Sequence, residues 1–280
     1  MAKEKRVALV TGGGRGLGQV MATALLQNGY DVILASTDTA ALKDAVAKAG
    51  DTRGTAKWIA VDLALPGEAE RLAEQATALF GRVDILINNA GISINALSRD
   101  YFTNPYRFWK SDRAVIERFF AINTIAPLVL SNLLVPGMIE RGWGRIVANT
   151  TSLDTMLRIP LYGGSKAALE AESAVMAKDL ADTGVTANVL IPGGGTATRM
   201  TDEVGIPRDQ LFPDTIMAAP VLFLASDESN GFSGRRLLAN RWKTDLPMKE
   251  AAALASDPIA WTGFGTAGLH PTMAMQAPAK

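Results

Sequence analysis

The chain has 280 residues, of which 48% are hydrophobic and 20% charged, a composition typical of a globular protein with a large core. Lysine plus arginine and aspartate plus glutamate number 28 each, so no global positive field exists to hold nucleic acid, and we expect no nucleic-acid partner. The chain has no cysteine and one histidine, His270, which excludes disulfides and thiolate chemistry and argues against a metal site.

Short apolar runs alternate along the chain with segments such as residues 18–30 and 67–81, which carry apolar residues at helical spacing. Runs that are apolar at successive positions are expected for parallel strands covered by helices on both faces. The runs span residues 6–10, 31–36, 56–61, 83–88, 144–149 and 185–191, with a weaker run at 234–240. The alternation predicts one α/β domain over residues 1–245, built on a doubly wound, Rossmann-like parallel sheet.

Residues 246–280 form a C-terminal extension rich in alanine, proline, threonine and methionine. We expect this extension to be partly disordered, or to pack on the domain or on a neighbouring subunit.

The chain shows neither a secretion signal nor a clear membrane span. Its charged start passes straight into a short apolar run without the length or cleavage region of a signal peptide. The most apolar internal stretch, residues 124–139, contains two prolines and falls short of the roughly 20 clean residues that a bilayer requires. We therefore expect a cytoplasmic protein that does not enter a membrane.

A glycine-rich turn, TGGGRGLG, connects the first apolar run to the first helical segment. Glycines let the backbone approach a pyrophosphate closely, and the free amides at a helix start favour its negative charge. The position between a buried strand and an amphipathic helix is the context that such a motif needs. The turn predicts a dinucleotide site formed by Gly12, Gly14, Arg15, Gly16, Leu17 and Gly18.

The TGxxxGxG spacing resembles the short-chain dehydrogenase/reductase family, and further matches follow in the family's order, over about residues 7–234. Asp62 and Leu63, in the sequence VDL, match the position that contacts the adenine ring. The NNAG turn supplies Asn89, Ala90 and Gly91. The resemblance implies a nicotinamide-dependent enzyme that interconverts a ketone and a secondary alcohol.

A further segment, IPGGGTATRM, resembles the family's contact with the nicotinamide carboxamide, although its threonine-methionine pair comes one residue late. The resemblance implies that Gly193 and Thr198 bind the cofactor there.

The end of the second expected strand bears on the choice of cofactor. A carboxylate there binds the adenosine ribose hydroxyls and repels a 2′-phosphate. Here Ser36 and Thr37 follow the strand instead, and Arg15 supplies a guanidinium that pairs well with phosphate oxygens. We therefore expect NADP(H) to be favoured over NAD(H); the alternative is that Arg15 is solvated and Asp38 holds the ribose.

Tyr162 and Lys166 occur in YGGSK, four residues apart at the start of a long helical pattern, and so share one helix face. A free phenol titrates near ~10, and a neighbouring positive charge favours the phenolate, so we expect the ammonium to lower the phenol pKa. The resemblance makes Tyr162 the general acid in reduction and the general base in oxidation, with Lys166 also binding the nicotinamide ribose.

Asn123 matches the family's catalytic asparagine, and Pro127 removes the helical hydrogen bond to its carbonyl, which could open the helix for a water. In relatives such a water connects the lysine to solvent; the alternative is an asparagine that only bends a helix.

The catalytic hydroxyl is ambiguous between Thr151 and Ser152. Counting without gaps places the family's serine position at Thr151, and adjacent strand side chains point to opposite faces. We predict Ser152, re-aimed by a bulge at the strand end, with Thr151 as the alternative.

The segment between Gly91 and Asn123 is longer than the family expects, and its residues 99–110 contain five aromatic rings. The rings either line the substrate pocket, which favours a cyclic, aromatic or otherwise apolar substrate, or pack beneath the loop or against another subunit. The rings belong to Tyr101, Phe102, Tyr106, Phe108 and Trp109.

Two other functions remain open. Many relatives reduce 3-oxoacyl thioesters on a carrier, and a non-catalytic module could sense NADPH, although sensing would require no paired phenol and ammonium. By analogy with relatives we expect a homodimer or homotetramer formed through the helices that carry Asn123 and Tyr162.

Overall fold

The computed structural model describes residues 5–101, 104–203 and 206–261. Within these ranges an eight-stranded sheet has the order β3-β2-β1-β4-β5-β6-β7-β8, parallel except for the antiparallel pair β7 and β8. The strands are β1 (Val7–Thr11), β2 (Asp31–Ser36), β3 (Ala56–Ala60), β4 (Ile85–Asn88), β5 (Gly144–Asn149), β6 (Val185–Ile191), β7 (Arg235–Leu238) and β8 (Ser256–Pro258). The predicted doubly wound parallel sheet is thus confirmed.

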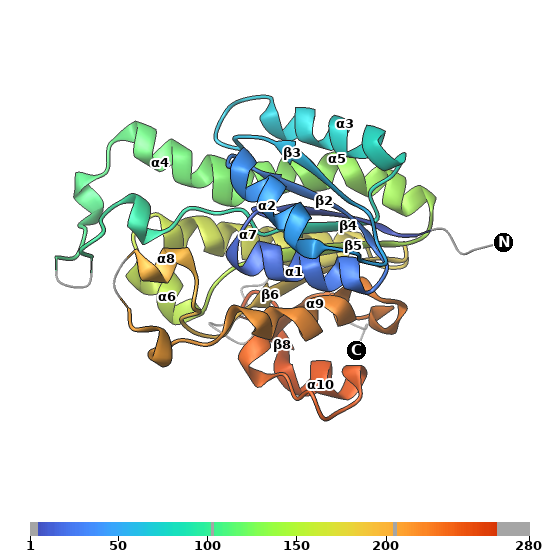
Figure 1. Cartoon of the computed structure of the whole chain (residues 1–280). Helices are drawn as coiled ribbons and strands as arrows, with labels where there is room; N and C mark the ends of the chain where they lie inside the picture. Colours follow the sequence, from blue (N-terminus) through green and yellow to red (C-terminus); the bar gives the residue numbers. More distant parts are fainter. Residues whose placement is uncertain (1–4, 102–103, 204–205, 262–280) are drawn as a thin grey trace, which may run out of the picture.

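Helices connect the strands and cover both faces of the sheet, as Figure 1 shows. They are α1 (Gly16–Gln27), α2 (Thr39–Ala49), α3 (Glu68–Phe80), α4 (Arg113–Phe120), α5 (Ala126–Glu140), α6 (Leu153–Arg158), α7 (Tyr162–Asp179), α8 (Arg199–Asp202), α9 (Ala218–Ala225) and α10 (Met248–Ala255).

The alternation of side chains along each strand divides the interior into two main cores. In β1, Ala8 and Val10 join the core beneath α1, α2, α9 and α10, whereas Val7 and Leu9 join the core beneath α3, α5 and α7. Successive strand residues face opposite sides, so a strand that is apolar at every position can bury both faces. This explains why the strand sequences are continuous apolar runs.

The connections place the candidate site at the middle of the sheet. β1 pairs with β2 on one side and with β4 on the other, so the strand order reverses between β1 and β4. In open α/β sheets, ligands bind at such a reversal, outside the carboxyl ends of the strands. The turns after β1, β4, β5 and β6 all lie at that edge.

The helix from Arg113 to Glu140 joins α4 to α5 through a π-helical turn, Ala121–Ile125. Among the described residues it is the one helix long and apolar enough to cross a membrane by length and composition, which the sequence analysis did not expect. Half of its most apolar window is buried in the protein, and α3 packs against α5. A buried core helix of a soluble protein passes the same test, so the finding is weak evidence for a membrane span.

Part of the predicted C-terminal extension packs on the sheet. α10 buries three alanines, and β8 pairs with β7 through the register Arg236 to Asp257. Residues 262–280 lie outside the described residues, so the boundary at 245 stays a prediction.

Candidate active site

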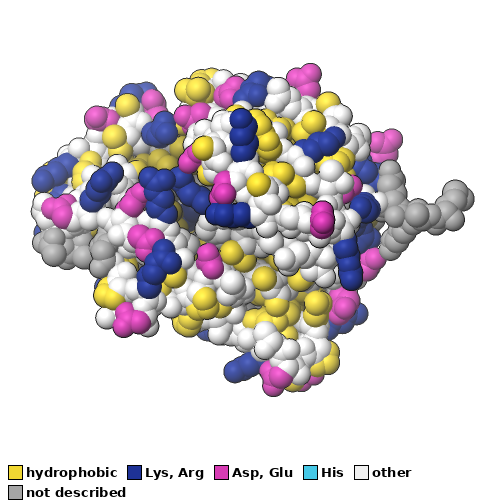
Figure 2. All heavy atoms as spheres, in the orientation of Figure 1, with side chains coloured by type: hydrophobic (Ala, Val, Ile, Leu, Met, Phe, Trp, Pro, Cys, Tyr) yellow, Lys and Arg dark blue, Asp and Glu magenta, His cyan; other side chains and the backbone are white. Residues whose placement is uncertain are grey.

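A cavity of about 530 Å³ opens at the carboxyl ends of the strands. The glycine turn, the ends of β2, β4 and β5, the segment after β6 and the start of α7 line it. Three arginines, Arg15, Arg118 and Arg199, are part of the lining. Figure 2 shows basic side chains gathered on this face between α4, α8 and α2. The basic rim suits an anionic ligand.

The glycine turn is shaped to let a ligand approach the backbone. Gly12 and Gly16 have φ of +65° and +53°, in the left-handed region that favours glycine. A Cβ at Gly18 would lie 2.2 Å from the Gly12 carbonyl oxygen, so only glycine fits there. The turn leads directly into α1, whose first amides have no helical partner. These features fit the pyrophosphate of a dinucleotide.

The turn after β4 is locked to the glycine turn by Thr11. The Thr11 hydroxyl accepts hydrogen bonds from the backbone amides of Asn89 and Ala90, each at 3.0 Å. The Asn89 side chain donates in return to the Thr11 carbonyl at 2.9 Å. The two predicted cofactor segments therefore form one rigid wall of the cavity.

Most of the predicted cofactor-binding residues line the cavity. Gly14 is the exception: an added Cβ there would meet Ala41 and Leu42 of α2. The predicted residues that line it are Gly12, Arg15, Gly16, Leu17, Gly18, Ser36, Thr37, Asp62, Leu63, Asn89, Ala90, Gly91, Tyr162, Lys166, Gly193 and Thr198.

Two hydroxyl-bearing residues at the end of β2 line the cavity, whereas the carboxylate that follows them, Asp38, is engaged elsewhere. Asp38 caps α2 by accepting the Ala41 amide at 3.0 Å, and its second oxygen lies 3.4 Å from the Arg15 guanidinium. Ser36 and Thr37 line the cavity, and Asp38 is not part of the lining. The Asp38 carboxylate is thus held at the start of α2, outside the cavity lining.

Tyr162 begins α7, directly after Leu161, which has a φ of +62°. Burial raises the pKa of Tyr162 to about 12, although the Thr151 side chain opposes the shift. The expected lowering of the phenol pKa by the lysine is therefore not found in this structure, because desolvation of the phenolate dominates.

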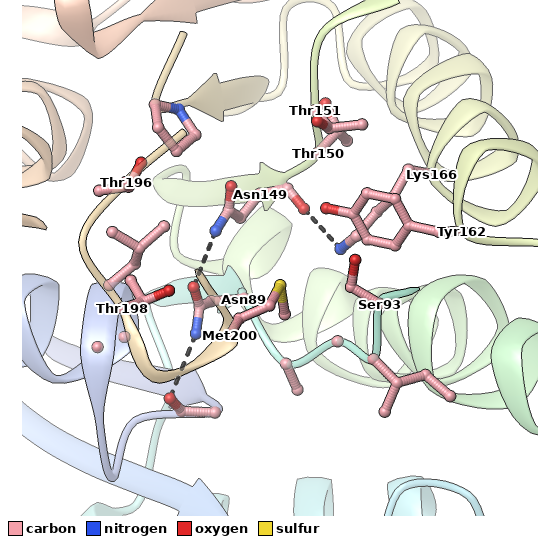
Figure 3. Close-up of a pocket in the computed structure, with 18 of the residues that line it drawn as sticks. Asn89, Ser93, Asn149, Thr150, Thr151, Tyr162, Lys166, Thr196, Thr198 and Met200 are labelled. Carbon is pink, nitrogen blue, oxygen red and sulfur yellow. Dashed lines mark hydrogen bonds between the residues drawn. The ribbon is translucent and has the colours of Figure 1, made fainter. Parts of the chain in front are cut away.

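Lys166 lies one helical turn further along, beside the Tyr162 ring in Figure 3. Its ammonium donates to the Asn149 carbonyl at 2.8 Å, and burial lowers the pKa of Lys166 to about 8. A buried ammonium with one backbone acceptor is poised to bind a further oxygen in the cavity.

Ser152 and Thr151 have different roles in the structure. β5 ends at Asn149, and Ser152 is the N-cap of α6: its hydroxyl accepts the Thr155 amide at 3.2 Å and lies 2.8 Å from the Thr155 hydroxyl. Both residues line the cavity, but the Ser152 hydroxyl is engaged at the start of α6. The geometry therefore favours Thr151, the alternative, over the predicted Ser152.

Asn123 lies within the π-helical turn, fully buried and outside the cavity lining. Its amide donates to the Ile92 carbonyl at 3.0 Å and to the Ser165 hydroxyl at 2.9 Å, and its oxygen accepts the Ile92 amide at 2.9 Å. The side chain thus joins the turn after β4 to α7. Its predicted role toward a water stays a prediction.

The aromatic residues of the long loop do not line the cavity in the part of the loop that the structure describes. Phe108 and Trp109 are 70% and 68% exposed and form an edge-to-face pair. Tyr101 donates to the Arg158 carbonyl at 3.0 Å and so ties the loop to α6. Phe102 lies outside the described residues.

Part of the cavity lining is apolar, which no sequence motif indicated. Isoleucine and methionine side chains lie there with the hydroxyls of Ser93 and Thr155. The apolar residues are Ile92, Ile159, Met200 and Ile206.

Asn149 is a further site residue that the sequence analysis missed. The side-chain amide of Asn149 donates to the Asn89 side chain at 2.9 Å. The side-chain oxygen of Asn149 is buried without a hydrogen-bond partner among the described residues. A polar residue at the end of an apolar strand was the available signal.

The fold and the cavity define a dinucleotide-binding α/β protein. Residues 6–208 match the sequence model of a family described as short chain dehydrogenase. The chain belongs to the short-chain dehydrogenase/reductase family and is an NAD(P)-dependent oxidoreductase.

Individual relatives cover most of the chain. An uncharacterized oxidoreductase of Mycobacterium tuberculosis is 33% identical over 88% of this chain and 97% of its own length. The 3-oxoacyl-(acyl-carrier-protein) reductase of Salmonella typhimurium is 31% identical over 86% of this chain and 98% of its own. Among solved structures, a 3-oxoacyl (acyl-carrier-protein) reductase from Agrobacterium tumefaciens with NADP bound has a TM-score of 0.74, with 26% identity, over 83% of this chain and 92% of its own.

Proposed function

We propose that the protein interconverts a ketone and a secondary alcohol with NADP(H), and that Tyr162 transfers the proton. The observation that carries the proposal is that Tyr162, Thr151 and Lys166 together line the cavity that begins at the glycine turn (Figure 3). Two hydroxyls that line one cavity can bind the same substrate oxygen.

In the reductive direction, the high pKa of Tyr162 keeps its phenol protonated at neutral pH, which is the form that can protonate a carbonyl oxygen. Thr151 donates to that oxygen as negative charge develops on it. The Lys166 ammonium stabilises the phenolate left behind, as an opposite charge does within a few ångströms. Bound NADP(H) supplies the hydride in this direction and accepts it in the other.

Asn123 positions these groups from outside the cavity in this proposal. Its side chain fixes the turn after β4 against α7 through Ile92 and Ser165. In this proposal Ser152 caps the start of α6 and lines the cavity without taking part in proton transfer.

The preference for NADP(H) rests on the end of β2. A 2′-phosphate there would meet the Ser36 and Thr37 hydroxyls and the Arg15 guanidinium, while Asp38 is held at the start of α2. We expect kcat/KM to be higher with NADPH than with NADH. A clear preference for NADH would overturn this part of the proposal.

The central test compares Tyr162→Phe with Tyr30→Phe. Tyr30→Phe is the matched control, because it removes the same hydroxyl from a tyrosine outside the cavity lining. The Tyr30 hydroxyl donates to the Ala225 carbonyl. Turnover is followed by nicotinamide absorbance with cyclohexanone, acetoin, ethyl acetoacetate and acetoacetyl-CoA as probes, and NADPH binding by fluorescence. We expect Tyr162→Phe to lose turnover and retain NADPH binding, and Tyr30→Phe to retain both. Unchanged turnover in Tyr162→Phe, or no NADPH binding by the natural protein, would refute the proposal.

A second candidate substrate class is a 3-oxoacyl thioester. Several relatives bear this activity in their names, including the Salmonella reductase and an acetoacetyl-CoA reductase of Allochromatium vinosum. The described loop aromatics, which favoured a cyclic substrate, lie outside the cavity lining, and the apolar side chains that do line it include Ile92, Ile159, Met200 and Ile206. A kcat/KM for acetoacetyl-CoA well above that for cyclohexanone would favour the thioester.

We also propose assembly as a homodimer or homotetramer, supported by exposed apolar side chains on α5 and α7: Leu133, Ile139 and Val175. Light scattering tests this assembly. The cytoplasmic location stays a prediction.

A further inference from the structure

Three successive residues, the last residue of β5 and the two that follow it, are each held by a buried side chain from elsewhere in the chain. Lys166 donates to the carbonyl of Asn149 at 2.8 Å. The Thr150 hydroxyl donates to the Glu170 carboxylate at 2.8 Å. The Arg236 guanidinium donates to the carbonyl of Thr151 at 2.5 Å. The segment that brings Thr151 to the cavity is therefore held by a buried side chain at each of these three residues.

Glu170 and Arg236 also pair with each other. Their nearest charged atoms lie 3.3 Å apart, and the two side chains are 0% and 10% exposed. Burial raises the pKa of Glu170, against the lowering by Arg236, and a backbone hydrogen bond from Ala260 also lowers it. A buried ion pair is weak evidence for stability, because desolvation offsets most of the Coulomb attraction. The hydrogen bonds that the pair makes to the segment indicate a different role.

The position of Glu170 on α7 supports that role. It follows Lys166 by four residues and Tyr162 by eight, so one face of the helix carries all three. Arg236 reaches the same place from β7. β5 ends at Asn149 and α6 starts at Leu153, so Thr150 and Thr151 belong to neither element.

We propose that Glu170 and Arg236 are positioning residues that hold Thr150 and Thr151 so that the Thr151 hydroxyl stays in the cavity that Tyr162 also lines. This inference rests on the proposed function, in which Thr151 and Tyr162 bind the substrate oxygen together. Neither Glu170 nor Arg236 lines the cavity, so both act through Thr151.

The double variant Glu170→Leu/Arg236→Met removes both charges together and avoids leaving one buried charge unpaired. Replacement of a buried ion pair by apolar residues is often neutral or stabilising, so the variant should fold with a Tm near that of the natural protein. We expect unchanged NADPH affinity and a loss of kcat of about tenfold to a hundredfold, because a misplacement of about 1 Å can cost that much. Activity is measured with the best substrate of the ketone and thioester panel.

Arg235→Met is the matched control on the same strand. Arg235 bonds Ser256 through its guanidinium and makes no contact with the segment after β5. We expect this control to keep the natural kcat. A double variant that folds, binds NADPH and retains the natural kcat would overturn the inference.

A coupling experiment separates the inference from the function on which it rests. If Glu170 and Arg236 act through Thr151, the double substitution should cause no further loss of kcat in a Thr151→Val background. If Thr151→Val itself keeps full activity, the proposed role of Thr151 fails instead. A crystal structure of the double variant decides the positioning without any substrate: Thr151 should have moved relative to Tyr162, and an unchanged position of Thr151 would refute the inference.

Discussion

Replacing the buried ammonium of Lys166 should stabilise the folded protein at neutral pH. Lys166 is 3% exposed, and burial lowers its pKa from 10.5 to about 8. The folded state thus binds this proton less tightly than the unfolded chain does. The resulting free-energy penalty on folding is complete below about pH 8. The penalty fades as pH rises from about 8 to 10.5. A difference of about 2.5 pKa units corresponds to about 3 kcal/mol of folding free energy.

The variant Lys166→Met removes this penalty and keeps a side chain of similar length. It also removes the hydrogen bond to the Asn149 carbonyl, whose loss costs about 1–2 kcal/mol. We therefore expect Lys166→Met to gain about 1–2 kcal/mol in free energy of unfolding at pH 7, and to lose that advantage by about pH 10.

Urea unfolding followed by tryptophan fluorescence, at pH 7 and pH 10, measures both values in the two proteins. Reduced stability of the variant at pH 7, or a difference that is the same at both pH values, would show that the ammonium carries no such penalty. The same variant should lose turnover, since the group that stabilises the Tyr162 phenolate is gone.

Three further predictions follow from contacts in the structure. Gly18→Ala places a methyl 2.2 Å from a backbone carbonyl oxygen, so NADPH affinity should fall at least about tenfold by fluorescence titration, whereas Gly14→Ala, with no contact under 3.4 Å, should bind normally. Asp84→Ala should lower the free energy of unfolding by about 3–5 kcal/mol in urea, because this fully buried carboxylate accepts from two arginines and a backbone amide. Replacing the exposed rings of Phe108 and Trp109 by serine should leave kcat/KM within about twofold; a large loss would place the loop over bound substrate.

The parts of the fold that the sequence predicted are those where local pattern and burial agree. The run before Gly12 is apolar at successive positions because β1 buries both faces, and the glycines after it are required by backbone conformation and close contacts. β8 was missed, since three residues, Ser256–Pro258, carry no apolar alternation that would indicate a strand.

The catalytic hydroxyl shows why site geometry is harder to predict than fold. Whether Ser152 or Thr151 faces Tyr162 depends on where β5 stops and how α6 begins, not on strand alternation. A serine followed three residues later by Thr155 and preceding an apolar pattern is an N-cap signal that could have assigned Ser152 to the helix start. Arg236 lies far along the chain from Thr151, and no local pattern links the two.

The short strand β8 also has a consequence for the outer boundary of the sheet. Without it, β7 would present its unpaired backbone groups to solvent, as a template for pairing with other chains. β8 covers that edge of β7 with three residues. Its last two residues, Asp257 and Pro258, discourage a further strand, because one is charged and the other has no amide hydrogen. The residues after α10 thereby have a feature that natural sheets use against pairing with other chains, independently of any contribution to the cavity.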